Sequence, residues 1–438
     1  MKKQTKQSFI FQIALFLSLH TLFLSCKNDE PTTTLPSVEA RCAYDFYQSM
    51  GVCTHIGYST TTYGNFDQIT YPLLKELGIK HIRDGYGGML SKTEQDQRYK
   101  ILGAEGIKIL FCTGTANPAS LMTSIKNLLP YLSGVEGSNE VDFTNGKDPV
   151  QWVPISVSRQ QIFYDSIKNN LATKDLPVVN FSLAELGNAA KLVGDQTNKI
   201  DYGNLHIYAA AKHPANHWGG GLTEDQALSY IRLVSGTKPI IMTECGYHNY
   251  VSYPSTHAGV PEEISAIYIP HLFFEYFNKG ISRSYIYELL DQNPDIDGDK
   301  ELHFGMIRCD GTPKPVFYAL KNLISLISDD KITTPMPLNF ELKTGTELGG
   351  KYLRYTLLQK SNGRWWIAAY RTNELFDTNL LINKTVQPEK MTLNLASKAK
   401  EINIYIPNKS IDKQITFSNQ NSIDFNLGSE LVLIEISM

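Results

Sequence analysis

The sequence predicts a (β/α)8 barrel followed by a small antiparallel β-sandwich. Three observations lead to this fold class. Apolar, β-branched runs alternate with segments of helical spacing across residues 48–326, and this alternation and length are typical of a (β/α)8 barrel. Two of those runs end on a glutamate, at Glu140 and Glu244. After Leu326 the helical spacing gives way to short strand-like segments separated by polar turns.

The barrel strands are expected in chain order at short apolar runs: Met50–Tyr58, Lys80–Gly85, Ile107–Thr113, Leu132–Asp142, Leu176–Ser182, Ile200–Tyr208, Pro239–Tyr247 and Ser282–Leu290. Helical spacing predicts the connecting helices: Tyr71–Leu77, Lys92–Gly106, Leu121–Leu129, Ser156–Asn170, Thr223–Ser235 and Pro261–Lys279. A doubly wound open sheet is the alternative. It is less favoured because no Gly-rich phosphate loop follows the first strand.

The sandwich is expected over residues 332–438. Ser361-Asn362-Gly363 is a hairpin signal between Tyr352–Gln359 and Arg364–Arg371. Further short strands are expected at Thr392–Leu395, Ile402–Ile406, Ile415–Ser418, Ile423–Leu427 and Glu430–Ile436. Such a domain packs against a barrel and stabilises it, so Trp365 and Trp366 are expected in its core rather than as a sugar platform.

The N-terminus predicts export. Three lysines precede an apolar run from Phe9 to Leu24, which is typical of a secretory signal over residues 1–26 and too short and interrupted for a transmembrane anchor. The ending Leu-Phe-Leu-Ser-Cys26 resembles a bacterial lipoprotein signal with Cys26 lipidated, and Lys27-Asn28-Asp29-Glu30 resembles the surface-export tag of Bacteroidetes lipoproteins. We therefore expect a flexible tether over 27–47 and a lipid-anchored location in the cell envelope, at the outer membrane and exposed on the cell surface.

Composition and cysteine spacing bear on whether the protein binds nucleic acid or a metal ion. The formal net charge of −3 gives no electrostatic case for nucleic acid. The cysteines show no metal-ligand spacing, and Asp295–Asp299 lacks the full ligand set of a calcium loop, so a solvated acidic turn is favoured there. We expect no metal and no organic cofactor.

Two carboxylates at the ends of two barrel strands are what a glycosidase requires. The arrangement resembles the clan A glycoside hydrolases, which carry Asn-Glu after the fourth strand and Glu after the seventh. Asn139-Glu140, Thr243-Glu244, His206-x-Tyr208 and the segment Phe304–Lys321, similar to the last barrel segment, all match in order. The resemblance implies a retaining hydrolase acting on a β-linked oligo- or polysaccharide, with Glu140 as acid/base and Glu244 as nucleophile. Because the N-terminus predicts export, we expect this glycan to be extracellular.

The resemblance also assigns substrate-binding roles. Asn139 would bind the sugar 2-hydroxyl, Tyr208 would hold Glu244 through its hydroxyl, His206 would line the same subsites, and Arg83 would keep Glu244 ionised. Structural alternatives exist for two of these residues. Asn139 is also a plausible helix cap, and Arg83 with Asp84 a plausible ion pair at the barrel end.

Four other residues carry weaker expectations. Glu136 is expected to be a barrel-interior partner of an arginine or lysine. Trp218, in a Gly-rich loop, is expected either to stack on a sugar ring or to anchor its loop. Tyr247 and Glu288 follow the seventh and eighth strands and are expected to line the pocket.

Two rival functions retain the same scaffold. One is a glycan-binding lipoprotein that holds sugar without cutting it, which would not need two carboxylates at those strand ends. The other is a transglycosylase, which needs every one of these residues and differs only in the acceptor.

Overall fold

The computed structural model describes residues 35–114, 118–145, 148–252, 257–295 and 298–438, and the signal peptide, Cys26 and residues 27–34 lie outside them. Eight parallel strands pair in the order β7-β6-β5-β4-β3-β10-β9-β8. A parallel bridge between Val179 and Tyr202 joins β7 to the segment that leads into β8, so the sheet is closed. The predicted (β/α)8 barrel is therefore confirmed.

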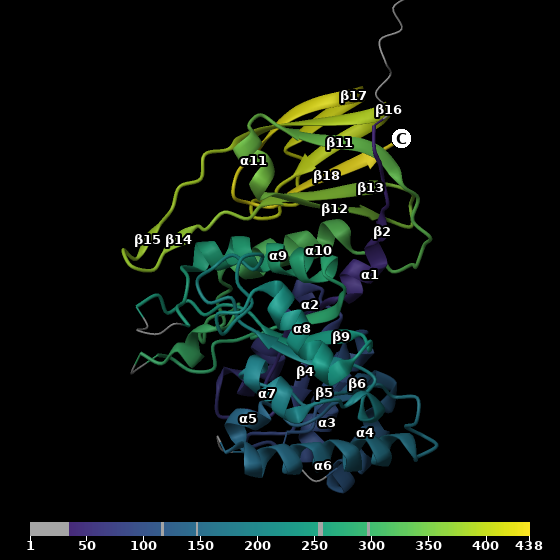
Figure 1. Ribbon diagram of the computed structural model, residues 1–438, viewed down its shortest axis with the longest axis vertical. Helices are drawn as coiled ribbons and strands as arrows, with labels where there is room; N and C mark the ends of the chain where they lie inside the picture. Colours follow the sequence, from purple (N-terminus) through teal and green to yellow (C-terminus); the bar gives the residue numbers. More distant parts are fainter. Residues whose placement is uncertain (1–34, 115–117, 146–147, 253–256, 296–297) are drawn as a thin grey trace, which may run out of the picture. The chain divides into compact units, whose positions relative to one another are not determined.

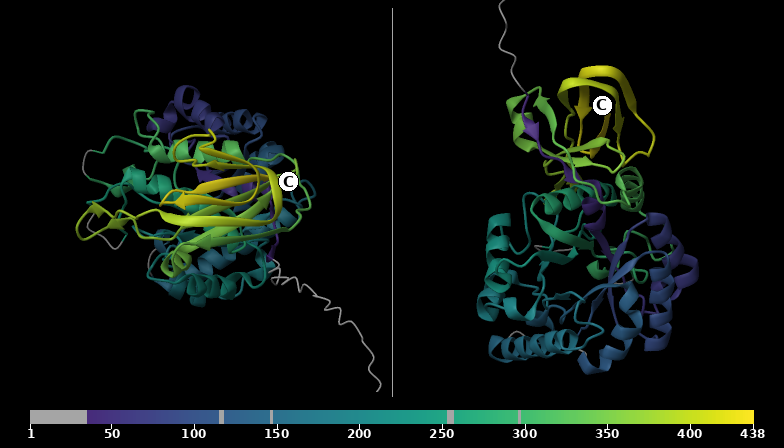
Figure 2. Two further views of the ribbon diagram at one scale, coloured as in Figure 1. Left: turned by 90° about the horizontal axis from the view of Figure 1, so that it is seen from above. Right: turned by 90° about the vertical axis from the view of Figure 1, so that its right-hand side faces the viewer.

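Each barrel strand is followed by a helix (Figure 1; Figure 2, right). The strands are β3 (Met50–Cys53), β4 (His81–Gly85), β5 (Lys108–Cys112), β6 (Leu132–Glu136), β7 (Val178–Val179), β8 (Gly203–Ile207), β9 (Ile240–Cys245) and β10 (Ile281–Ile286). The helices that follow them are α2 (Tyr71–Leu77), α3 (Lys92–Ala104), α4 (Pro118–Leu128), α6 (Pro149–Lys168), α7 (Leu186–Val193), α8 (Glu224–Ser235), α9 (Glu262–Asn278) and α10 (Pro315–Ile327). A short helix, α5 (Val141–Thr144), precedes α6.

Helix starts follow local chemistry. Helices α3 and α8 each begin with a capping box, Ser91 with Glu94 and Thr223 with Gln226. Helix α6 begins at Pro149, earlier than expected, because the Asp148 side chain accepts a hydrogen bond from Val150 N and proline fits the first helical turn. The sequence prediction also lacked α7.

The C-terminal strands form the predicted sandwich. In hydrogen-bonding order the sheet is β1-β11-β16-β18-β13-β12-β2, with β17 on β16. Its strands are β1 (Ser37–Val38), β2 (Arg41–Cys42), β11 (Leu338–Thr344), β12 (Leu353–Gln359), β13 (Trp365–Arg371), β16 (Glu389–Tyr405), β17 (Ile415–Leu427) and β18 (Val432–Ser437). A small hairpin, β14 (Phe376–Asp377) with β15 (Ile382–Asn383), and helix α11 (Glu347–Tyr352) complete the domain.

The long strand β16 belongs to both layers of this sandwich. Its first part pairs with β11 and its last part with β18, and its register with β17 shifts between Asn394 and Ala399. The sequence had suggested two short strands here, because polar residues interrupt the apolar alternation at the bend. Trp365 and Trp366 are both buried, as expected.

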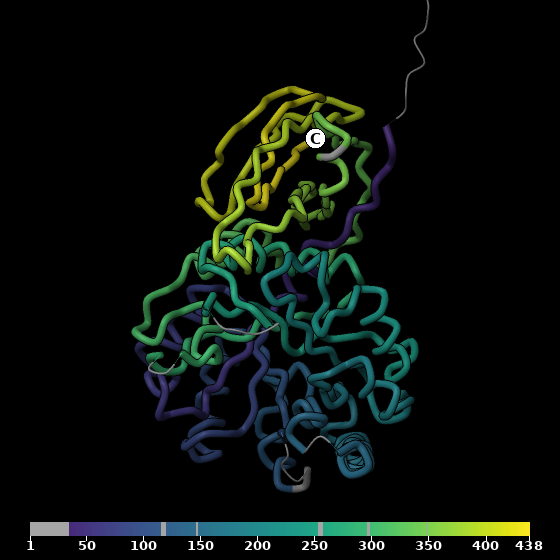
Figure 3. The backbone as a smooth tube through the Cα atoms, turned by 60° about the vertical axis from the view of Figure 1, so that its left-hand side comes forward, coloured from purple at the N-terminus to yellow at the C-terminus, as the bar shows by residue number. Residues whose placement is uncertain are grey.

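The N-terminal residues pair with this C-terminal sheet (Figure 3). Strand β1 runs antiparallel to β11, and β2 runs parallel to β12. Helix α1 (Ala43–Gln48) then leads into the barrel. The tether expected over 27–47 is thus replaced by regular structure from residue 37 onward, because main-chain pairing needs no apolar side-chain pattern. In the described ranges, no helix has the length and apolarity needed to cross a bilayer.

Helix α9 connects the barrel to the sandwich. Asn278 Nδ2 donates to Thr356 Oγ1 at 2.8 Å, and Tyr370 on β13 donates its hydroxyl to Glu275 at 2.9 Å. The His271 ring stacks on Tyr370 with centroids 4.6 Å apart. These polar contacts lie within a junction that is otherwise apolar, since Leu358, Trp366 and Leu433 of the sandwich belong to the same buried cluster as the barrel core.

Candidate active site

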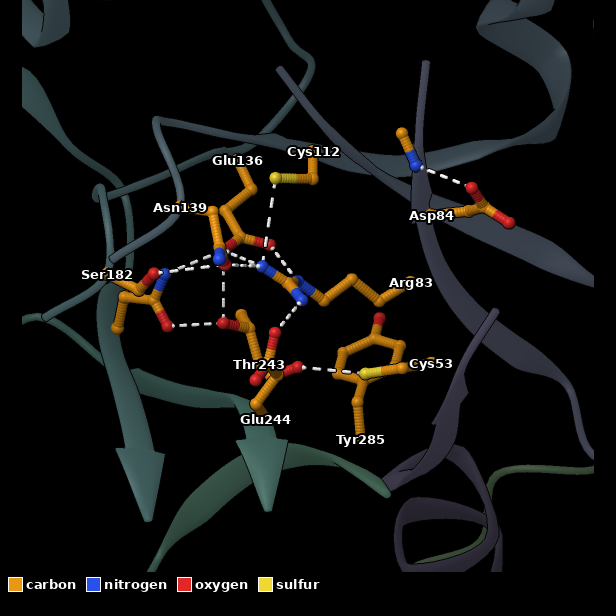
Figure 4. Close-up of polar contacts among 12 residues, drawn as sticks. Cys53, Arg83, Asp84, Cys112, Glu136, Asn139, Ser182, Thr243, Glu244 and Tyr285 are labelled. Atoms are coloured by element: carbon orange, nitrogen blue, oxygen red, sulfur yellow. Dashed lines mark hydrogen bonds and ion pairs between the residues drawn. The ribbon is translucent and has the colours of Figure 1, made fainter. Parts of the chain in front are cut away.

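Arg83, in the middle of β4, lies at the centre of the site (Figure 4). Its guanidinium donates to both oxygens of Glu136, from Nε at 2.6 Å and from Nη2 at 2.9 Å. Nη1 donates to Glu244 Oε1 at 2.6 Å, and Nη2 also reaches Asn139 Oδ1 at 2.6 Å. One planar cation therefore fixes the positions of side chains from β6, the loop after it, and β9.

Glu136, the last residue of β6, is fully buried. Besides Arg83, its Oε1 accepts from Asn204 Nδ2 at 3.0 Å and lies 3.1 Å from Thr243 Oγ1. The expectation that Glu136 is a barrel-interior partner of an arginine is confirmed. A buried carboxylate with this many donors holds the Arg83 fork in one orientation.

Glu244 lies near the end of β9, with Oε1 on Arg83 and Oε2 accepting from the Tyr208 hydroxyl at 2.8 Å. Burial opposes ionisation of this carboxyl. The charges of His206 and Arg83 and the hydrogen bonds from Tyr208 and Arg83 outweigh burial, and they lower the pKa of Glu244. Glu244 is therefore a fixed, ionised carboxylate.

Glu140 follows β6 in a left-handed backbone conformation, with φ 43° and ψ 59°. Its N–H donates to Ser182 Oγ at 2.8 Å, and it forms the N-cap position of α5. With this backbone, unusual for a residue with a side chain, the carboxylate contacts His206 on β8. The Glu140 side chain is 24% exposed, in contrast to the buried Glu244.

His206 on β8 lies between the two carboxylates. Its Nδ1 is 3.0 Å from Glu140 Oε1 and 3.5 Å from Glu244 Oε2. Burial lowers the pKa of the ring, but the charge of Glu244 and the hydrogen bond with Glu140 outweigh it and raise the pKa overall. One oxygen of each glutamate and one nitrogen of His206 lie within 4.8 Å of one another.

These three ligand atoms are a poor metal site. Both Glu244 oxygens already accept hydrogen bonds, from Arg83 and from Tyr208. The Arg83 cation, 2.6 Å from Glu244, would repel a divalent ion.

The acidic turn near Asp295 is a separate feature. Asp295 accepts hydrogen bonds from Gly298 N and Asp299 N and pairs with His303, so its carboxylate is used in bonds within the turn.

Aromatic rings stand beside the carboxylates. The Tyr208 ring lies 5.1 Å from His257 and 5.6 Å from Phe304, measured between centroids. On the side of β3, His55 stacks on Tyr58 at 4.6 Å. Flat rings around a carboxylate pair are suited to binding the apolar faces of a sugar.

Three predicted substrate contacts are absent from this group. Trp218 is 1% exposed and packs edge-on against Tyr276 of α9, so it anchors its loop and offers no face to a sugar. Tyr247 is buried with its hydroxyl on the Lys212 carbonyl. Glu288 is fully buried behind His55, 3.4 Å from its Nε2, and accepts from the Tyr63 hydroxyl. Neighbours from other elements decide these positions, and the local sequence does not reveal them.

Sequence reasoning brought together Arg83, Asn139, Glu140, His206, Tyr208 and Glu244, and the structure places all six in one cluster. It missed Asn204 and Ser182. Asn204 and His206 on β8 and Tyr208 directly after it occupy every second position, so the strand period of two could have revealed Asn204. Ser182 left no comparable signal.

No family model matches the chain, and no curated protein matches it. Among solved structures, a family 39 glycoside hydrolase from Bacteroides cellulosilyticus superposes with a TM-score of 0.64 at 14% identity, over 91% of this chain and 83% of that one. A family 17 β-1,3-glucanosyltransferase from Rhizomucor miehei gives a TM-score of 0.43 at 16% identity, over 63% and 97%. The fold assignment rests on the first. The chain thus shares the fold of a glycoside hydrolase, a (β/α)8 barrel with an appended β-sandwich.

Proposed function

We propose that the protein is a retaining glycoside hydrolase that cleaves a β-linked glycan. The observation that carries the proposal is the approach of Glu140 and Glu244, whose nearest carboxylate oxygens lie within 4.8 Å. Retaining enzymes hold their two carboxyls about 5 Å apart, whereas inverting enzymes leave room for a water between them. The β linkage rests on the family resemblance.

The first step would form a covalent glycosyl-enzyme. Glu244, kept ionised by Arg83 and Tyr208, attacks the anomeric carbon while the bond to the leaving oxygen breaks. Glu140 donates its proton to that oxygen. The amide of Asn139, oriented by Arg83 through Oδ1, presents Nδ2 to the sugar 2-hydroxyl, a contact that strengthens as the transition state forms.

The second step releases the sugar. Glu140, now a carboxylate, takes a proton from water, and the water oxygen displaces Glu244 from the anomeric carbon. The two roles follow from the two environments. Glu244 is buried and bound to the Arg83 cation and the Tyr208 hydroxyl, whereas Glu140 is partly open to solvent beside His206.

We further propose that the substrate is an extracellular oligo- or polysaccharide and that a lipid on Cys26 anchors the enzyme in the outer membrane. The support is the N-terminal sequence alone. Labelling with radioactive palmitate should mark the wild type and leave Cys26→Ala unlabelled, and label on both proteins would contradict the anchor.

The test of function is a panel of aryl β-glycosides and glycans treated with wild type, Glu140→Ala and Glu244→Ala. The control is Glu347→Ala, an exposed glutamate on the sandwich. We expect each active-site variant to lose about 10²–10⁴-fold or more in kcat/KM, and the control to match wild type.

Azide then separates the two roles. With Glu244→Ala it should yield an α-glycosyl azide, and with Glu140→Ala a β-glycosyl azide. A wild type that binds a glycan of the panel without cutting it, with both variants binding equally well, would replace catalysis by glycan binding.

A further inference from the structure

The hydroxyl of Thr243, one residue before Glu244, meets three partners in the barrel interior. Asn204 Oδ1 lies at 2.6 Å, His206 Nε2 at 2.9 Å and Glu136 Oε1 at 3.1 Å. Thr243 and Glu136 are completely buried, and Asn204 is 2% exposed. A hydroxyl has one proton to donate, so the direction of each bond can be worked out.

The orientation of the Asn204 amide is fixed independently of Thr243. Its Nδ2 donates to Glu136 Oε1 at 3.0 Å and to the Asn180 carbonyl at 2.9 Å, and neither of these atoms can donate in return. Its oxygen must therefore face Thr243. Since Asn204 Oδ1 and the Arg83-bound Glu136 carboxylate only accept, the Thr243 proton goes to one of them.

The third contact of Thr243 then has one possible direction. Because the hydroxyl proton is used, Thr243 Oγ1 can only accept from His206, and Nε2 of that ring carries a hydrogen. The other ring nitrogen, Nδ1, faces Glu140 Oε1 at 3.0 Å. Without a proton between them, the lone pair on Nδ1 and the carboxylate oxygen of Glu140 would repel each other at this distance. One proton must therefore lie on Nδ1 or on Glu140.

We propose that Thr243 and Asn204 hold His206 in the Nε2–H form, so that His206 Nδ1 and Glu140 share the proton that acid catalysis consumes. This inference rests on the proposed function and deepens it. Thr243 and Asn204 are positioning residues, since they act through His206. If Thr243 could not accept, the neutral ring would turn to the Nδ1–H tautomer and satisfy Glu140 as a carboxylate, with no proton to give.

The proton count closes over both steps. In the first, the shared proton moves to the leaving oxygen as the Glu244–carbon bond forms and the glycosidic bond breaks. The Nδ1 lone pair then faces the Glu140 carboxylate, which makes Glu140 a stronger base toward water. In the second, a water proton returns to the pair as the carbon–oxygen bond of the product forms and the Glu244 ester breaks.

The first test reads the tautomer without any substrate. Histidine-ring ¹⁵N NMR spectra of full-length wild type, Thr243→Ser and Thr243→Val would be compared, with His206→Gln to assign the signals. We expect a protonated Nε2 on His206 in wild type and Thr243→Ser, and the Nδ1–H tautomer in the isosteric Thr243→Val. A neutral Nδ1–H ring in wild type, or an unchanged Nε2–H ring in Thr243→Val, would overturn the inference.

The second test uses 4-nitrophenyl and 2,4-dinitrophenyl glycosides of the sugar that the panel selects. In Thr243→Val we expect the alkaline limb of kcat/KM to move down by about one pH unit and the 4-nitrophenyl rate at pH 7 to fall about tenfold. The dinitrophenyl substrate, whose leaving group needs no acid, should change by less than about threefold. Thr243→Ser should restore the alkaline limb.

Equal losses on both substrates, with no movement of the limb, would show that Thr243 is merely structural. The NMR result stands even if the wild type cleaves no glycoside, so failure of this inference and failure of the proposed function are distinguishable.

Discussion

Acid should weaken the junction between the barrel and the sandwich through a buried pair of histidines. His213 Nε2 and His271 Nδ1 are 3.1 Å apart, and His213 Nδ1 accepts from Ala215 N at 3.1 Å. His213 therefore donates to His271 as a neutral ring. A proton added to either ring would place two N–H groups against each other, because Nδ1 of each ring already receives a donor.

The size of the effect follows from His271. Burial lowers the pKa of this ring from 6.5 to about 3, so the unfolded chain binds a proton between these values and the folded chain does not. The contribution of the neutral His271 ring to the free energy of unfolding is complete above pH 6.5 and is lost as the pH falls below that value. Between pH 7 and pH 5 this one ring should remove about 2 kcal/mol from the free energy of unfolding.

The assay is urea unfolding at pH 7 and pH 5, followed by tryptophan fluorescence. His271→Phe has no titrating ring at this position, so its free energy of unfolding should fall by about 2 kcal/mol less than that of wild type. His271→Asn can still accept a hydrogen bond from His213. Its free energy of unfolding should show the same reduced pH dependence as that of His271→Phe, and at pH 7 it should be closer to the wild-type value. An identical pH dependence in wild type and both variants would refute the reasoning.

Two further changes test the centre of the site. Tyr208→Phe removes a hydrogen bond from Glu244 and should raise its pKa, so the acidic limb of kcat/KM should move up by about one pH unit; an unmoved limb would mean that Tyr208 does not hold the nucleophile. Glu136→Gln leaves the buried Arg83 with one fewer counter-charge and should lower the free energy of unfolding by about 3 kcal/mol in urea titrations. A loss below about 1 kcal/mol would show that Glu244 alone compensates Arg83.

The carboxylate positions could be predicted from sequence because strand ends carry a local signal. An apolar run followed at once by a polar turn marks the end of β6 that leads to Glu140, and the period of two through β8 and the residue after it puts His206 and Tyr208 on one side. These are properties of a few consecutive residues.

The position of Trp218 could not be predicted in this way. Its Gly-rich loop suggested exposure, but the partner that buries it, Tyr276, comes from α9. Glu288 likewise is buried by Tyr63 and His55, which follow β3 and lie more than 220 residues before it in the chain. Burial that depends on a distant element leaves no trace in the local pattern.

Residues 37–42 pair with strands from the last quarter of the chain. Strands β1 and β2 occupy the two ends of the main strand path, so residues 37–42 cover the edges of β11 and β12, while β17 forms a further edge on β16. Uncovered edges recruit strands from other molecules and promote aggregation. Because Ser37 pairs with Asn339, this protection forms only after about 300 further residues have been synthesised. The covering strands are therefore already present when β11 and β12 emerge, whereas loss of residues 37–42 would leave the edges of β11 and β12 open in the mature protein and promote its aggregation.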